Sequence, residues 1–430
     1  MKFKSIKGTK DILPAESAKW QQAESSIRAI MHSFNFREIR TPIFEETSLF
    51  ARGIGELTDI VGKEMYTFQD RSGDSLTLKP EMTASVVRAY IQHNLGEQQP
   101  LVKVYYISPM FRQERPQAGR LRQFHQFGAE AIGGANPEID AEIIALACEV
   151  YRALGIKNVL LKINSVGCEK CRPGYKKALQ DFLEQMLDRL SEPSRQRFLQ
   201  NPLRILDSKD ETDRGLTKNA PLMKDHLCAE CKDHFAGLQE SLKLFEVPFE
   251  IDGRIVRGLD YYTKTAFEIV SNDLGSQDAL AGGGRYDLLA EELGGKRTPG
   301  VGFAAGIERL LMVIEKQAIS LGIESHPQLF LIAADEAGKK WVLQQALVLR
   351  RQGISYDFDL LGRSVKSQMR EADRQHADFC VVIGNNELQK GTVEIKNLKD
   401  GTLQPSRLKD FIEDVRSAVR SLETSDAKKK

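Results

Sequence analysis

The sequence lacks several features that would assign a protein to a broad class at once. No apolar run in its 430 residues approaches the roughly 20 residues that a membrane span needs. Its first residues, MKFKSIKGTKDILP, contain no apolar stretch typical of a secretory signal. The net charge is only +1, so the chain has no overall positive field that would attract a polyanion. These absences predict a cytoplasmic protein, not bound to a membrane, that meets any polyanion through a local cluster of charge.

Cysteine is also scarce, and its six copies are expected to be thiols or metal ligands rather than disulfides. Four of them form two CxxC pairs, Cys168 with Cys171 and Cys228 with Cys231. This spacing lets both thiolates of a pair reach one ion, and four thiolates suit tetrahedral Zn²⁺. The separation between the pairs is longer than in common zinc ribbons. Four reduced, partly buried cysteines near helix starts are therefore the alternative.

The composition, 41% hydrophobic and 28% charged, is that of a globular chain with room for two or three domains. A helix is expected over residues 17–34, ended by Asn35, since asparagine tolerates the left-handed conformation. The following segment, REIRTPIFEE, reads as extended, and Pro42 suits an edge or interface strand. Residues 167–246 are polar and rich in helical patterns, which indicates an inserted subdomain that contains both CxxC pairs.

The C-terminal part has a different pattern. The segments FLIAA, ISYDFDL and FCVVIG alternate with helical stretches at 336–352 and 364–376. This alternation predicts a compact α/β domain with a largely parallel sheet over residues 327–424. Residues 425–430 are expected to be a disordered basic tail.

The segments VKVYYISPMFRQE and RQFHQFGAEAIG predict an antiparallel hairpin with a basic loop, RPQAGRL, between its strands. Strand alternation places Arg122 on one face of the second strand with Phe124, Gln126, Gly128 and Glu130, and His125 on the other. Arg112 and Glu114 share a face of the first strand. Arginine suits bidentate contact with phosphate or carboxylate, and Phe124 could stack on a flat base. A salt-bridged surface hairpin is the alternative.

Two glycine-rich segments favour the binding interpretation. In GVGFAAGIER, Gly302, Ala304 and Gly306 leave one strand face bare, so that a ligand could lie on the backbone. Arg309, just inside the following helix, could then meet an anion. Close packing of strand on helix is the alternative. The segments AGGGRYD and RGLDYYT add a glycine-rich turn, an arginine and tyrosines, although tyrosines in strands more often pack than recognise a ligand.

Together these segments resemble the signature motifs of class II aminoacyl-tRNA synthetases, and specifically the histidyl-tRNA synthetase family. FREIRTPIF resembles motif 1, with Pro42 as its interface proline and Asn35 where a glycine often stands. FRQE…RLRQFHQFGAE resembles motif 2, and GVGFAAGIER resembles motif 3 with Ala304 in place of a glycine. RGLDYYT and AGGGRYD look like the two peptides peculiar to the histidine enzymes, and LTLKPEMTASVVR like their amino-acid-binding segment.

The resemblance covers nearly the whole chain and implies its organisation. It implies an α+β catalytic domain, with an antiparallel sheet flanked by helices, formed by residues 1–166 and 247–324. A helical insertion over 167–246 would interrupt it, and residues 327–424 would form a C-terminal α/β anticodon-binding domain. The implied activity is that of a homodimeric histidine–tRNA ligase. Such an enzyme activates L-histidine with ATP and Mg²⁺ to histidyl-adenylate and pyrophosphate, then transfers histidine to the 3′ end of tRNA(His).

The resemblance also implies roles for individual residues. Glu81 and Thr83 would hold the amino group of histidine, and Gln126 would contact the bound amino acid. The histidine-binding set would comprise Glu81, Thr83, Arg112, Gln126, Glu130, Arg257, Tyr261, Tyr262 and Tyr286. Among these, Glu130, Tyr262 and Tyr286 would recognise the imidazole ring.

The remaining implied roles concern ATP and tRNA. Phe124 would stack on adenine, and Arg309 would hold the ATP phosphates. The ATP-binding set would comprise Arg112, Glu114, Phe124 and Arg309. The catalytic residues would be Arg257, Arg112 and Arg309. Arg112 and Arg257 would both act on the α-phosphate, and Arg309 would act through its contact with the ATP phosphates. The tRNA acceptor end would contact Arg115, Arg120 and Arg122.

Two other functions are alternatives. A histidine-binding regulatory paralogue without aminoacylation is expected to lose the motif arginines and the anticodon module. Here Arg112, Arg257 and Arg309 are all present, and a long segment follows motif 3. A zinc-dependent RNA-binding protein would explain the cysteines but not the glycine-rich segments.

Overall fold

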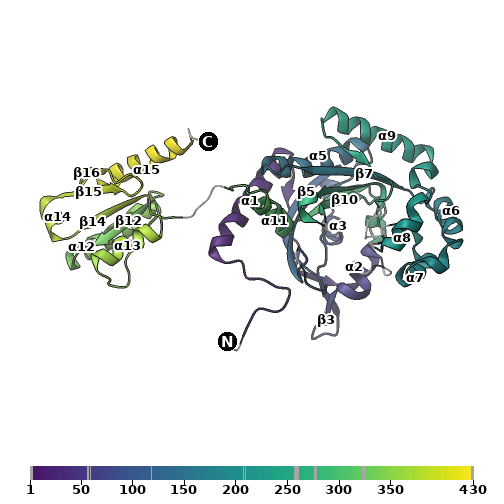
Figure 1. Cartoon of the computed structure of the whole chain (residues 1–430), viewed down its shortest axis with the longest axis horizontal. Coiled ribbons are helices and arrows are strands. Elements are labelled where there is room, and N and C mark those ends of the chain that lie inside the picture. The colour runs from purple at the N-terminus through teal and green to yellow at the C-terminus, as the bar shows by residue number, and fades with distance from the viewer. Residues whose placement is uncertain are drawn as a thin grey trace. The chain divides into compact units, whose positions relative to one another are not determined.

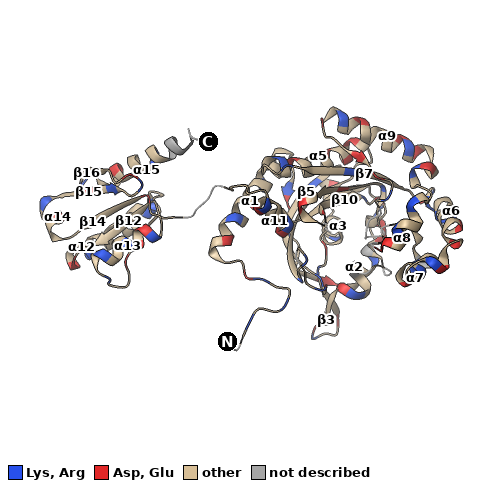
Figure 2. Cartoon of the chain, in the orientation of Figure 1, with Lys and Arg blue, Asp and Glu red and all other residues tan. Residues whose placement is uncertain are grey.

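The computed structural model of the chain describes residues 3–55, 58, 60–117, 119–206, 208, 210–255, 261–275, 278–321 and 326–427. The chain divides into two compact units, Met1–Gly322 and Ile323–Lys430, which can be followed in Figure 1. Within the described ranges, every helix is too short or too polar to span a lipid bilayer. Basic and acidic side chains are interspersed over both units, in keeping with the small net charge (Figure 2).

The first unit is built on an eight-stranded sheet, antiparallel except at its two edges. In spatial order its strands are β1 (Arg37–Glu38), β5 (Val102–Phe111), β6 (Gln123–Ile132), β11 (Gly300–Gly306), β10 (Ala279–Arg285), β9 (Thr263–Ser271), β7 (Val159–Gly167) and β8 (Glu250–Ile251). The predicted hairpin is formed by β5 and β6, which pair along their whole length. The expected antiparallel sheet flanked by helices is therefore confirmed.

Four helices bury their apolar side chains against one face of this sheet. Phe127 and Ala129 of β6 belong to that core. Because side chains alternate along a strand, Gln126, Gly128 and Glu130 face the opposite side. The four helices are α1 (Pro14–Ser33), α5 (Pro137–Ala153), α9 (Ala229–Leu244) and α11 (Ile307–Lys316).

A second apolar cluster, containing Met82, Tyr106 and Tyr286, lies on the opposite face of the sheet. Its helical residues, including those packed around it, come from α3 (Thr83–Gln92), α4 (Leu95–Gln98) and α10 (Leu289–Glu292). This face carries the site described below. The first unit also contains α2 (Thr47–Ile54), the π-helical turn η1 (Ile60–Glu64) and a small antiparallel sheet of β2 (Phe44–Glu46), β4 (Ser75–Leu78) and β3 (Tyr66–Gln69).

The structure of the segment after α1 confirms one prediction made from the sequence and differs from another. Asn35 has a φ of 61°, which is the left-handed conformation predicted for it. The edge strand β1, however, ends at Glu38, and Pro42 lies in the connection to β2 rather than in a strand. A proline has no backbone N–H to donate, so Pro42 could not extend this ladder at its own position.

Residues after β7 form the expected helical insertion, which has its own small core around Tyr175, Leu179 and Leu183. Its elements before α9 are α6 (Arg172–Glu184), η2 (Leu187–Arg189), α7 (Glu192–Gln200), η3 (Pro202–Ile205), α8 (Glu211–Leu216), η4 (Thr217–Asn219) and η5 (Met223–His226). A further 3-10 turn, η6 (Asn272–Leu274), follows β9. The last insertion helix, α9, returns to the main core through Leu238 and Leu242.

A buried ion pair joins three elements of the first unit. Arg285 of β10 pairs with Asp140 of α5, and both side chains are 0% exposed. His234 of α9 brings its Nε2 to 3.3 Å from Asp140 Oδ1. Burial alone would raise the pKa of Asp140, but the positive charge of Arg285 and the hydrogen bond with His234 hold it below its usual value. Removal of either partner would leave a buried charge without compensation.

The second unit is an α/β domain, as predicted, but its sheet is mixed. In spatial order the strands are β13 (Tyr356–Phe358), β12 (Leu329–Ala333), β14 (Phe379–Ile383), β15 (Thr392–Asn397) and β16 (Leu403–Arg407). The pairings of β12 with β13 and β14 are parallel, whereas those of β15 are antiparallel. The expectation of a largely parallel sheet missed β15 and β16, which form a hairpin without a crossover helix.

The helices of the second unit are α12 (Glu336–Arg351), α13 (Val365–Arg374), α14 (Asn385–Lys390) and α15 (Phe411–Ala427). The expected tail is shorter than residues 425–430, because α15 continues to Ala427 and the last three residues lie outside the described ranges.

Candidate functional site

A cavity of ≈ 310 Å³ lies against the polar face of β6 and β11. It brings together segments that are far apart in the sequence, from the start of α3 to the start of α11. Most of the predicted site residues line it: Glu81, Thr83, Arg112, Glu114, Arg120, Phe124, Gln126, Tyr261, Tyr262, Tyr286 and Arg309. The hairpin is therefore one wall of a cavity and not a solvated surface.

The pairing of β6 with β11 explains the small residues predicted to leave a bare face. Gly302 lies opposite Glu130, and Gly306 lies opposite Gln126. A Cβ at residue 302 would lie 1.7 Å from Glu130 Oε2, so only glycine leaves room for this carboxyl group. At Gly306 the nearest atoms, those of Arg309, are 3.9 Å or more away, and this part of the strand borders the cavity.

Glu130 is fully buried just behind the cavity wall. Thr83 Oγ1 donates a hydrogen bond to its Oε1 at 2.8 Å, and the Tyr286 hydroxyl donates to its Oε2 at 2.6 Å. Burial raises the pKa of Glu130 to about 8, although both hydrogen bonds act to lower it. The group can therefore carry a proton near neutral pH and accept polar hydrogens at one end of the cavity.

Glu81 joins this end of the cavity to helix α3. Its carboxylate accepts hydrogen bonds from the backbone N–H groups of Thr83, at 2.7 Å, and Ala84, at 2.9 Å. These donors have no partner within the helix, so an acidic group at the helix start suits them. Burial nevertheless raises the pKa of Glu81 above its usual value. Two carboxyl groups, Glu81 and Glu130, thus lie at one end of the cavity.

Aromatic rings pack around the two carboxyl groups. The ring of Tyr261 lies 4.8 Å from that of Tyr262 and 6.0 Å from that of Tyr286, measured between centroids. Tyr106 is fully buried beside them, and burial raises its pKa well above the usual value. Tyr106 is absent from the predicted set, although strand alternation places it on the same face of the hairpin as Arg112.

Arginines gather at the other end of the cavity. Arg112 Nε donates to the carbonyl of Pro80 at 2.9 Å, and its guanidinium lies over the Phe124 ring at 5.3 Å from the centroid. Arg309 donates to the carbonyl of Ala279 at 2.7 Å. Burial lowers the pKa of Arg309, and the positive charge of Arg120 lowers it further. The Glu114 carboxylate, 3.4 Å from Arg120 and 3.9 Å from Arg112, offsets part of this charge, and the positive charge that remains favours an anionic ligand.

Gln126 also lines the cavity. Its Oε1 is buried and has no hydrogen-bond partner within the described part of the chain. Buried polar atoms are normally satisfied, so an unmatched acceptor on a cavity wall indicates a ligand donor.

Some predicted residues lie elsewhere. Arg115 is exposed on the β5–β6 loop, and Arg122 packs against the N-terminal segment, where its N–H donates to the carbonyl of Gly8 at 2.7 Å. Arg257 lies outside the described residues. His125, predicted to lie on the opposite face of its strand, is not a lining residue, although its Nδ1 is 2.9 Å from Oε1 of Glu308, which does line the cavity.

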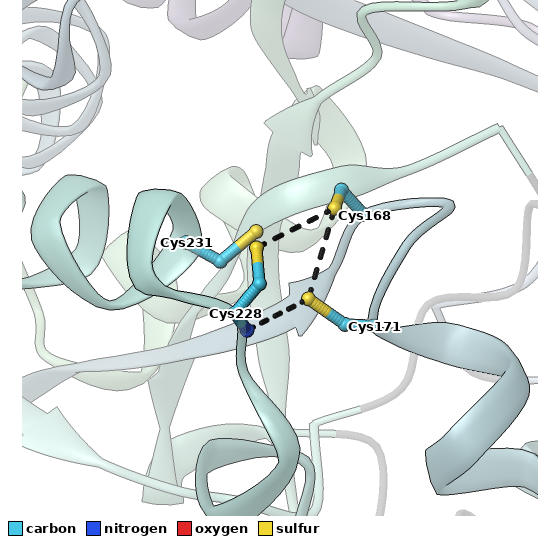
Figure 3. Close-up of side chains that lie close together, drawn as sticks. All are labelled: Cys168, Cys171, Cys228 and Cys231. Carbon is cyan, nitrogen blue, oxygen red and sulfur yellow. Dashed lines mark hydrogen bonds between the residues drawn. The ribbon is translucent and has the colours of Figure 1, made fainter.

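The two CxxC pairs meet at the base of the insertion. Figure 3 shows Cys168 beyond the end of β7, Cys171 at the start of α6, and Cys228 and Cys231 at the start of α9. Their four Sγ atoms all lie within 4.8 Å of one another. This arrangement is the one group of three or more potential metal ligands found among the described residues.

Comparisons with known proteins agree with this arrangement. Residues 8–310 match the family model described as histidyl-tRNA synthetase, and residues 328–418 match that of an anticodon binding domain. A histidine–tRNA ligase of Halothermothrix orenii is 49% identical over 420 residues, which is 97% of this chain and 100% of the relative. The one from Chloroherpeton thalassium is 52% identical over 402 residues, 93% and 94% of the two chains. The crystal structure of apo S. aureus histidyl-tRNA synthetase has a TM-score of 0.83 and 38% identity, covering 96% of this chain and 99% of that chain.

The space left by Gly302 predicts different effects of alanine at two positions of one strand. Gly302→Ala should lower the free energy of unfolding of the first unit by about 1–3 kcal/mol, because Glu130 and its neighbours are too tightly packed to move. Gly306→Ala, the matched control, should change it by less than about 0.5 kcal/mol. Urea unfolding followed by the fluorescence of Trp20, in a Trp341→Phe background, measures this. Equal midpoints for the two variants would contradict the packing argument.

The raised pKa of Glu130 predicts a pH dependence of stability. The folded chain retains this proton up to about pH 8, whereas an unfolded glutamate loses it near pH 4.5. The contribution to stability is therefore fully present below about pH 4.5 and is lost as the pH rises through about 8, by at most about 1.4 kcal/mol per pH unit. Glu130→Gln should reduce this slope in the same urea assay between pH 5 and 8. A variant with the slope of the parent chain would show that Glu130 titrates normally.

Proposed function

Because this chain belongs to the histidyl-tRNA synthetase family, we propose that its cavity binds histidine at the Glu130 end and ATP at the arginine end. The chain is a histidine–tRNA ligase: it forms histidyl-adenylate and pyrophosphate from L-histidine and ATP, then transfers histidine to tRNA. The observation that carries the proposed arrangement is the polarity of the cavity. Glu81 and three tyrosines line one end, with Glu130 buried just behind them, and three arginines with the Phe124 ring and the carboxylate of Glu114 line the other.

At the first end, Glu130 accepts from the imidazole ring, and Tyr262 and Tyr286 fix its plane. Glu81 and Thr83 hold the α-amino group, while the free acceptor of Gln126 contacts the bound amino acid. Tyr261 completes the wall. An apolar analogue would leave these buried groups without partners. A site built on hydrogen bonds can discriminate against such an analogue by roughly 10⁴-fold.

At the second end, the problem is repulsion between two anions, the histidine carboxylate and the α-phosphate of ATP. The carboxylate is already a nucleophile, so the reaction needs no general base. Arg112 and Arg257 contact the α-phosphate, and Arg309 contacts the other phosphates, which stabilises the negative charge in the transition state. Phe124 stacks on adenine, with Glu114 beside it.

Adenylate formation by this family uses ATP with a divalent metal, and we propose Mg²⁺ as that ion. Mg²⁺ binds through one or two carboxylates together with substrate phosphates, and it stabilises charge on those phosphates. Glu114, whose carboxylate lies 3.4 Å from Arg120 and 3.9 Å from Arg112 at the arginine end, would offer such a carboxylate, whereas Glu81 accepts from the start of α3. A second metal, Zn²⁺, is proposed for Cys168, Cys171, Cys228 and Cys231, away from the reacting atoms.

The basic loop between β5 and β6 is proposed to contact the acceptor end of tRNA(His) through Arg115, Arg120 and Arg122. Arg120 lines the cavity, and Arg115 extends outward from the same loop. One hairpin would thus serve ATP with its strands and tRNA with its loop. The proposed location is the cytoplasm, where tRNA is charged for protein synthesis.

We also propose that the enzyme is a homodimer that meets through the motif 1 region. Phe44 and Phe68 lie beside each other there and are 50% and 44% exposed, and Ile43 is 38% exposed. Neighbouring exposed apolar side chains of this kind often mark a contact with another chain.

If the protein is a homodimer, sedimentation should give twice the 48.3 kDa mass of one chain. Phe44→Glu should shift the protein to the monomer, because it places a charge in the contact. Phe245→Glu, at a residue that is 49% exposed elsewhere, should leave the dimer unchanged. A parent chain that sediments as a monomer at micromolar concentration would exclude the proposal.

Histidine-dependent exchange of pyrophosphate into ATP tests the reaction and separates it from a regulatory histidine-binding function. Arg257→Lys should slow exchange by ~10²-fold, because lysine keeps the charge but loses the bidentate fork aimed at the α-phosphate. Arg115→Ala, the control, should leave exchange unchanged and raise only the KM for tRNA. No exchange by the parent chain would refute the activity. An Arg257→Lys rate within a few-fold of the parent would refute the catalytic role of Arg257.

A further inference from the structure

We infer that the four-cysteine cluster is a structural zinc site that positions the histidine end of the cavity. The zinc assignment depends only on the geometry of Cys168, Cys171, Cys228 and Cys231. The effect on histidine depends also on the function proposed above. Two chains of contacts connect the cluster to the tyrosines of the cavity.

The sulfur positions fit one tetrahedral ion. With Zn–S bonds of about 2.3 Å, the sulfurs of a tetrathiolate site are about 3.8 Å apart. Cys168 Sγ lies 3.7 Å from Cys171 Sγ and 3.9 Å from Cys228 Sγ. These separations are far longer than the ~2.05 Å of a disulfide, and all four cysteines are free. A group of four sulfurs within 4.8 Å of one another leaves room for a single ion.

The surroundings of the sulfurs also suit thiolate ligands. The cluster lies at the starts of α6 and α9, where the helix dipoles favour negative charge. The backbone N–H of Cys228 donates to Cys171 Sγ at 3.1 Å, which is the kind of outer contact that orients a metal ligand. Cys171 and Cys231 are buried, at 5% and 0% exposure, so metal binding would enclose the site within the insertion core.

The first contact chain runs through Arg172, which follows the ligand Cys171 directly. Its guanidinium donates to the backbone carbonyl of Tyr262 and, at 3.3 Å, to that of Val166. Tyr262 lines the cavity. An ion that fixes Cys171 therefore also fixes the start of α6 and the arginine that holds this tyrosine.

The second contact chain runs through Glu230, which lies between the ligands Cys228 and Cys231. Lys264 Nζ is 2.9 Å from a carboxylate oxygen of Glu230 and 3.9 Å from Asp287. Asp287 follows Tyr286, and its N–H donates to Thr263 Oγ1 at 3.1 Å. This second series of contacts thus ends at the segment that carries Tyr286, which donates its hydroxyl hydrogen to Glu130.

Both chains end on segments of the histidine end, whereas the arginine end is formed by the β5–β6 loop and α11. Loss of the metal should therefore weaken histidine binding more than ATP binding. A site that only stabilised the insertion would not distinguish the two substrates.

The metal is tested on the full chain, purified under reducing conditions without chelator. Mass spectrometry of the elements should find about one zinc per chain. Cobalt substitution should give the thiolate charge-transfer and ligand-field bands of a tetrahedral site. Cys171→Ser should lose the metal, and Cys148→Ser, outside the cluster, should retain it. No metal, iron in place of zinc, or equal retention by both variants would overturn the zinc site.

The coupling is tested by Arg172→Leu, which keeps all four ligands. Its zinc content should equal that of the parent, while the KM for histidine in pyrophosphate exchange rises at least ~10-fold and the KM for ATP changes little. Arg172→Lys should restore part of the loss. Equal changes in both constants, or none, would overturn the coupling. Absence of exchange by the parent chain would instead refute the proposed function, and the metal measurements would still decide the zinc site.

Discussion

Glu130 can occupy its position only because residue 302 has no side chain, since a Cβ there would lie 1.7 Å from the Glu130 carboxylate. The space lies between two neighbouring strands, so it is part of the sheet and not of a mobile loop. The carboxyl group that fills it joins α3 through Thr83 and the end of β10 through Tyr286. Three segments that are distant in sequence thus take their relative positions from one pair of residues.

Buried polar contacts elsewhere in the first unit hold the residues next to this pair in place. Arg285 precedes Tyr286 and is held by Asp140 of α5, so the tyrosine that bonds Glu130 follows a residue fixed in the core. His234 extends the same network to α9, the helix that also begins with two of the cysteines. The recognition chemistry on one face of the sheet therefore depends on buried polar contacts with the helices on the other.

Local patterns in the sequence predicted the β5–β6 hairpin, the turn at Asn35 and the face of β6 that carries Gln126 and Glu130, because each depends on neighbouring residues. The sequence did not reveal the bond of Glu130 to Thr83 or the partner of Arg285. These depend on strand register and on contacts between distant segments. The antiparallel hairpin of β15 and β16 is missed for a related reason, because the alternation of strands with helices predicts parallel pairing throughout the domain.

The N-terminal segment bears on how this protein can be engineered. Gly8 has a φ of 91°, its carbonyl accepts from the N–H of Arg122, and a Cβ on it would lie 2.8 Å from side-chain atoms of Pro116 and Arg122. The beginning of the chain is thus packed on the base of the basic loop. An affinity tag or fusion partner joined at this end would sit a few residues from that loop and could hinder access of a large substrate.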